Sequence, residues 1–250
     1  MLDVPFSADE ESLARRRHEE CAQRRAASAT TADEHARRAE ACVEVGTFAL
    51  AFDTARDAHA AFGDAADAYL ESVEARVADP AGLDYAALPL HAWRGVYAAL
   101  LAGDRGRCRA FADAMAMTEQ EPEPGVALDD HPFWYATAVT AAAADDDETA
   151  RDALDGTAAG NQWANGTTTL LRGALDGDRR AVQTGLDDLL ERHRERVADP
   201  GRRELHATVF AAEATALTLL AWERGLEYDP GSRFVPASFL WETLPKLQTN

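Results

Sequence analysis

The chain has 250 residues, and its 44 Asp and Glu against 25 Lys and Arg give a formal net charge of −19. This length allows one large domain or two small ones, each with a sizeable core. The acidic excess argues against nucleic acid as a ligand, because phosphates are bound by clustered Lys and Arg on a positive face. Lys246 is the only lysine. A strong acidic excess with almost no lysine is typical of halophilic proteins, and the alternative is that part of the charge forms a face for a basic partner.

The cysteines and the apolar segments indicate a cytoplasmic protein. Cys21, Cys42 and Cys108 cannot all pair, and their spacing fits neither a redox nor a zinc motif, so we expect a reducing compartment. The N-terminal sequence MLDVPFSADEE is acidic, unlike a signal peptide. The long apolar run 205–222 is interrupted by Glu213. It therefore predicts a buried helix and no membrane span.

The first third of the chain carries helix signals. Ser7 with Glu10, and Thr31 with Glu34, have the spacing of capping boxes, which predict helices over about 8–27 and 32–61. We expect Gly63 and Asp64 to break the chain. A third helix should then run to the sequence DPAG at 79–82.

From about residue 88 the sequence predicts helical hairpins. The segments LLAGDR at 100–105 and ALDGDR at 174–179 each place a glycine after one helix and an aspartate before the next. A weaker third instance is AAADDDE at 142–148. We therefore predict an all-α, single-domain fold over 1–250, with about nine to eleven helices in tetratricopeptide-like antiparallel hairpins. The acidic, proline-bearing segment 118–130 is predicted to be an internal loop.

The segment 204–225 is apolar almost all round a helix, which predicts the central and most buried helix of the fold. Gly225 is a natural residue for the left-handed position that ends it. The sequence RGL then leads through an acidic, aromatic connector to FVP and a short last helix.

This C-terminal pattern resembles the signature of the immunity protein 49 family. The matching residues are fold-making ones: 216–222, Arg224, Gly225, Leu226, Ser232, Phe234, Val235, Pro236 and Leu240. The resemblance implies a protein that protects a cell by binding a polymorphic toxin and has no chemistry of its own.

No motif for catalysis or metal binding stands out. The seven histidines show neither HExxH nor any i, i+4 His pair, so we expect no metal, no cofactor and no catalytic residue. His206 and Glu213 interrupt the apolar surface of the predicted central helix, seven residues apart. They are expected to be hydrogen-bonded to neighbouring helices, and a functional site is the alternative.

The candidate partner-binding residues are acidic or aromatic and lie beside the predicted loop and turn. We expect the protein to bind and occlude a cognate toxin, and acidic residues would suit a toxin with a basic cleft. The alternatives are a helical-repeat adaptor with an unrelated partner and an enzyme with a site inside the array. The enzyme predicts a concave pocket with converging polar groups and shifted pKa values, whereas the adaptor predicts an open groove without them. The candidates are Asp129, Asp130, Trp134, Asp145, Asp146, Asp147 and Glu148.

Overall fold

The computed structural model describes residues 2, 4, 6–78, 87–117, 132–157, 165–199 and 204–249. Across these residues the chain forms eleven α-helices and a short 3₁₀ helix, and it forms no strand. The all-α prediction is confirmed. The helices are α1 (Ala8–Arg25), α2 (Ala32–Phe52), α3 (Ala55–Val77), α4 (Ala87–Ala102), α5 (Arg105–Ala116), α6 (Pro132–Ala143), α7 (Asp147–Gly156), α8 (Asn165–Asp176), α9 (Arg179–Ala198), η3 (His206–Thr208), α10 (Ala212–Glu223) and α11 (Ala237–Thr249).

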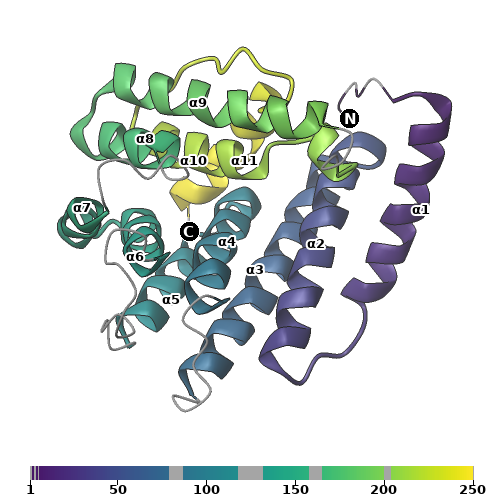
Figure 1. Ribbon diagram of the computed structural model, residues 1–250, viewed down its shortest axis with the longest axis horizontal. Helices are drawn as coiled ribbons and strands as arrows, with labels where there is room; N and C mark the ends of the chain where they lie inside the picture. Colours follow the sequence, from purple (N-terminus) through teal and green to yellow (C-terminus); the bar gives the residue numbers. More distant parts are fainter. Residues whose placement is uncertain are drawn as a thin grey trace.

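The helices pack as neighbouring pairs in two groups, which are α1 to α6 and the α8–α9 pair (Figure 1). Helices α1 to α4 lie side by side, with α5 and α6 beyond them, and the α8–α9 pair lies crosswise above one end of α2 to α4. Between the two groups, η3 contacts α2 and α9, while α10 contacts α4, α8 and α9. One continuous cluster of buried apolar side chains has members from every α-helix. The predicted loop 118–130 lies outside the described residues.

The N-terminal helices begin as the sequence predicts. Ser7 and Thr31 both form complete capping boxes, with Glu10 and Glu34 accepting from the cap backbone. The expected break at Gly63 is wrong, because the second helix ends at Phe52 and α3 runs through Gly63. The side chain of Thr54 accepts a hydrogen bond from the backbone of Asp57. It thereby starts a new helix at Ala55, before the expected break at Gly63.

The three predicted hairpin turns share one backbone geometry. Gly103 and Gly177 have φ of 76° and 70°, and Asp145 takes the same left-handed position in the third turn with φ of 66°. The residue after each one, an aspartate, caps the next helix. Its amide also donates to a carbonyl five residues earlier, for example from Asp146 to Ala141. Only the glycines make this geometry recognisable in sequence, which is why the third turn is the weakest signal.

The predicted central helix 204–225 is interrupted. Residues 206–208 form η3, and α10 begins only at Ala212. The cause is the C-terminal tail: the amide of Ala211 donates to the carbonyl of Phe234 at 2.9 Å, a partner outside the helix. The remaining helix is deeply buried, with Leu217 and Leu220 both 0% exposed. Helix α6 is buried over an equally long stretch. Gly225, with φ of 81°, ends α10 as expected.

Candidate functional site

The acidic turn 145–148 joins α6 to α7 and is largely engaged in the fold. Asp145 lies 3.0 Å from the Arg105 guanidinium, and Asp147 lies 2.8 Å from that of Arg224. The carboxylate of Asp146 accepts from the backbone of Thr149, and these hydrogen bonds lower its pKa. Glu148 is exposed, and no contact is recorded for its side chain.

Two arginines, the buried Arg105 and the half-buried Arg224, lie beneath this turn. Arg105 donates to the carbonyl of Ala143 at 2.6 Å and pairs with Glu223 at 2.9 Å, and both side chains of that pair are at most 10% exposed. Arg224 donates to the carbonyl of Ala142 at 2.8 Å. Both carbonyls lie in the last turn of α6, where carbonyls lack an α-helical partner and a cation complements the helix dipole. The carbonyl of Ala142 also accepts from the amide of Asp145 at 3.4 Å. Asp145 and Asp147 therefore balance arginines that close a helix end.

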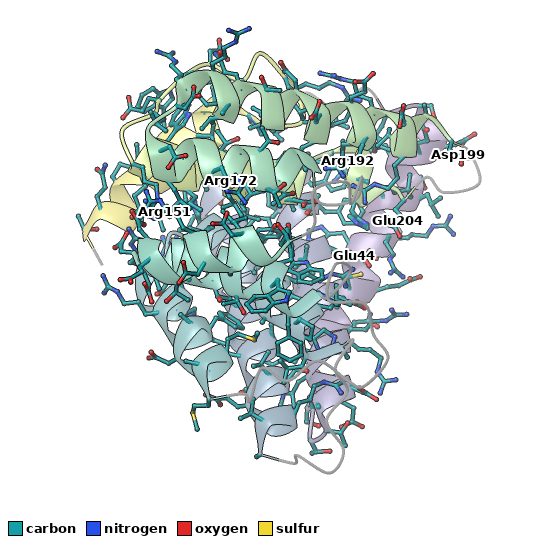
Figure 2. The ribbon with its side chains drawn as sticks, turned by 60° about the vertical axis from the view of Figure 1, so that its left-hand side comes forward. Glu44, Arg151, Arg172, Arg192, Asp199 and Glu204 are labelled. Carbon is teal, nitrogen blue, oxygen red and sulfur yellow. The ribbon has the colours of Figure 1, made fainter. Side chains whose placement is uncertain are left out.

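The same arrangement recurs between α7 and α8. Arg151 donates to the carbonyl of Leu175 and lies 3.6 Å from Asp176, and Arg172 donates to the carbonyl of Leu154 and lies 2.8 Å from Asp155. Figure 2 shows both arginines on neighbouring helices of one face. A guanidinium serves a carbonyl and a carboxylate together through its planar set of donors, which an ammonium does less well. Part of the arginine content is therefore structural.

The aromatic candidate also packs inside the array. Trp134 is half-buried on α6, and its ring lies over Gly156 of α7, where an added Cβ would come within 2.9 Å of the ring. Asp129 and Asp130 lie outside the described residues. Of the seven candidates, the structure thus leaves Glu148 exposed and free of recorded contacts.

A cleft of about 440 Å³ opens where the two groups of helices meet. Its walls come from α2 and α4 on one side and from the end of α9, η3 and the start of α10 on the other. Figure 2 shows Glu44 of α2 beside Glu204, which precedes η3, on this side of the molecule. The side chains that define it are four carboxylates, four aromatic rings, two histidines and two arginines: Glu40, Glu44, Glu204, Glu213, Tyr69, Trp93, Tyr97, Phe210, His193, His206, Arg94 and Arg196.

One end of the cleft is closed by a charged group around Glu44. Arg17 of α1 donates twice to this carboxylate, at 2.7 and 2.6 Å. Burial by itself raises the pKa of Glu44, but hydrogen bonds from Arg17 and the charge of His206 lower it below the ordinary value. His206 lies 3.3 Å from Glu204, and burial lowers its pKa. These residues connect α1, α2 and η3.

At the other end, a chain of hydroxyl groups leads to Glu213 in the first turn of α10. The phenols of Tyr97 and Tyr135 are 2.5 Å apart, and Tyr135 donates to Glu213 Oε1 at 3.4 Å. Thr167 of α8 donates to the same oxygen at 3.1 Å. Burial raises the pKa of both phenols. Both phenols therefore remain protonated and able to donate.

His193 completes the wall contributed by α9. Its Nε2 lies 2.8 Å from the carbonyl of Ala207, and Arg196 donates to Nδ1 at 3.2 Å. Because Nδ1 accepts, Nε2 carries the proton and donates to Ala207. Burial, with the charge of Arg196, lowers the pKa of His193 to about 4. The ring is neutral and holds η3 against α9.

Sequence reasoning found part of this cleft. It singled out His206 and Glu213, and both line the cleft, although they lie on separate elements and not on one helix face. The expected hydrogen bonds from Glu213 to neighbouring helices are present, because Tyr135 and Thr167 lie on α6 and α8. Tyr97 and Trp93 gave no signal, since aromatic residues in an apolar helix are indistinguishable from core.

No group of His, Cys, Asp and Glu in the described ranges is arranged to hold a metal ion. Within the same ranges, no helix combines the length and the apolar character that crossing a bilayer requires. Comparison with family models, curated proteins and solved structures finds no match to this chain.

Proposed function

We propose that this protein is an immunity protein that binds a cognate toxin and blocks it by occlusion. The proposal rests on the resemblance of its C-terminal residues to the immunity protein 49 family. In the fold those residues have structural roles: Arg224 closes α6, Gly225 ends α10, and Phe234 and Val235 are buried. A pattern of this kind identifies a fold, so the function follows from the resemblance and not from a set of reacting groups.

The observation that carries the proposal is the acidic cleft between the two groups of helices. A cavity of about 440 Å³ is within the range of about 300 to 1,000 Å³ that binding pockets occupy. Its carboxylates and aromatic rings suit a basic segment of a protein partner. The net charge of −19 would speed the encounter with such a partner and weaken that with nucleic acid.

The same cleft also supports a second candidate function, that of an enzyme with a site inside the helical array. It is concave, polar groups converge in it, and the pKa values of Tyr97, Tyr135 and His193 are shifted. These are the features that distinguish a catalytic pocket from an open adaptor groove. An adaptor with an unrelated partner has no comparable support.

Stoichiometry separates the first two functions. The proposed toxin, taken as the product of the adjacent reading frame, is purified, and its activity is titrated with this protein. Occlusion requires protection to reach its end point at a fixed ratio of protein to toxin, with a stable complex on size-exclusion chromatography. Complete protection at a small fraction of that ratio would instead require catalysis. Absence of both binding and protection would overturn the proposal.

The role of the acidic turn needs substitutions that do not disturb the fold. Removing Asp145 or Asp147 would take a carboxylate away from Arg105 or Arg224, which hold the end of α6, so Glu148→Gln is the suitable change. Glu19→Gln on α1 is the matched control, because Glu19 is also exposed and no contact is recorded for its side chain. If the turn forms the binding face, only Glu148→Gln weakens toxin binding. Equal affinities of the two variants would assign the charge of the turn to the fold and to salt adaptation.

A further inference from the structure

Glu213 differs from the other carboxylates of the cleft in its partners. Glu40 pairs with Arg94 at 3.1 Å and Glu44 with Arg17, and Glu204 lies 3.3 Å from His206, whose pKa burial lowers. Glu213 has no ion pair with any residue that the structure describes, and its recorded hydrogen bonds come from two neutral hydroxyl groups. Its side chain is exposed to the cleft. Among the described residues, Glu213 is thus a carboxylate of the cleft that is held in place with no basic side chain paired to it.

The hydroxyl groups fix the position of Glu213. Tyr135 and Thr167 both donate to Oε1, and no contact is recorded for Oε2. Since Tyr135 donates to the carboxylate, the phenol of Tyr97 donates in turn to Tyr135. A carboxylate oxygen held in place at the wall of a cavity is an acceptor for an incoming donor.

The surroundings of Glu213 suit a flat or extended cation. Tyr69, Trp93 and Tyr97 line the same cleft, with Trp93 packed edge-on to Tyr135 at 4.8 Å between ring centroids. Aromatic rings attract guanidinium and ammonium groups through their faces, and an arginine side chain also stacks on them. The cavity thus combines an anionic end with aromatic walls.

The arginines nearby are engaged elsewhere. Arg94 pairs with Glu40, and Arg196 donates to His193. Arg192 acts electrostatically on Tyr97 but forms no recorded ion pair with Glu213. None of these three arginines has a recorded ion pair with Glu213.

We propose that the cleft receives a basic side chain, arginine or lysine, of a protein partner and that Glu213 pairs with it. The identity of the source as a protein rests on the proposed function. The inference that the bound group is a cation rests on the geometry of the cleft alone. Glu213 would then be the residue that selects the partner, because a neutral side chain in the same place leaves the carboxylate unpaired.

The first test uses a probe in place of the toxin. Acetyl-Gly-Arg-Gly-amide is titrated into the protein and followed by NMR at the indole N–H of Trp93, assigned with Trp93→Phe, and the isosteric citrulline peptide is the neutral control. We expect the arginine peptide to bind, the citrulline peptide to bind at least about tenfold more weakly, and Glu213→Gln to weaken arginine binding by about tenfold or more. Glu148→Gln should leave it unchanged. Equal binding of the two peptides, or of wild type and Glu213→Gln, would overturn the inference.

The second test uses the toxin and separates this inference from the proposed function. Glu213→Gln should weaken toxin binding about tenfold or more, with Glu19→Gln as the matched loss of charge. If wild type and Glu213→Gln bind the toxin equally, the inference fails and the immunity function stands. If no toxin binds, while peptide binding still depends on Glu213, the immunity function fails and the cation site stands.

Discussion

Replacing Arg105 with methionine tests whether the acidic turn is held by buried charge. Arg105 donates to the carbonyl of Ala143, pairs with Glu223 at 2.9 Å and lies 3.0 Å from Asp145. Methionine fills similar space but leaves Glu223, whose side chain is 7% exposed, without its cation. Removing one partner of a buried ion pair costs about 3 to 5 kcal/mol. Since Asp145 is half-exposed and water reaches this end of the cluster, we expect about 3 kcal/mol.

The assay is urea denaturation followed by circular dichroism, since guanidinium chloride would screen the charges under study. Arg180→Met on the exposed face of α9 is the control and should change the free energy of unfolding by less than about 0.5 kcal/mol. Adding Glu223→Leu to Arg105→Met should restore most of the loss, because no charge is then left buried without a partner. A loss below about 1 kcal/mol for Arg105→Met, or no recovery in the double variant, would refute the reasoning.

The pH dependence of that loss has a defined sign. Burial raises the pKa of Glu223, and the charge of Arg105 opposes the rise. Without Arg105 the pKa rises further, and the folded protein takes up a proton at Glu223 more readily than the unfolded chain does. A raised folded pKa gives stability that is present below the unfolded pKa and is lost as the pH rises. The cost of Arg105→Met should therefore shrink as the pH falls toward the unfolded pKa of about 4.3.

Three further predictions use the same denaturation assay. Leu217→Ala removes a fully buried side chain from α10 and should cost about 2 to 5 kcal/mol; a loss under about 1 kcal/mol would show that the site is not packed as described. Gly95→Ala places a Cβ 2.1 Å from the ring of buried Phe111, so it should destabilise by about 1 to 3 kcal/mol despite the better helix propensity of alanine; a stabilised variant would contradict this. His193→Gln should flatten the fall of stability between pH 6.5 and about 4, because the folded pKa of His193 is about 4 and the unfolded chain, with a pKa of about 6.5, binds the proton first. An unchanged slope would argue against a neutral, buried His193.

Local sequence signals predicted the helical class and several of the helix ends. Capping boxes at Ser7 and Thr31, and glycines at 103, 177 and 225, act over three to five residues, so their spacing in the sequence is their geometry in the fold. The hairpin at 145 was weaker for the same reason, since Asp145 adopts the left-handed position that glycine takes elsewhere.

Tertiary contacts decided the remaining element boundaries. The stretch 204–225 has the pattern of one helix. The amide of Ala211 instead donates to the carbonyl of Phe234 in the C-terminal tail, and α10 begins only at Ala212. Nothing within the stretch encodes a partner more than twenty residues away. Gly63, which has the residue type of a break, lies inside α3 because Thr54 starts that helix earlier.

The candidate site was decided almost wholly by tertiary structure. The acids at 145–148 have the composition of a binding surface, yet Asp145 and Asp147 balance arginines from α5 and the end of α10. Glu213 had only the signal of a charge in an apolar run, and its role depends on hydroxyl groups from α6 and α8. Whether a carboxylate is paired depends on what the fold brings within about 4 Å of it, and in this chain those partners are distant in sequence.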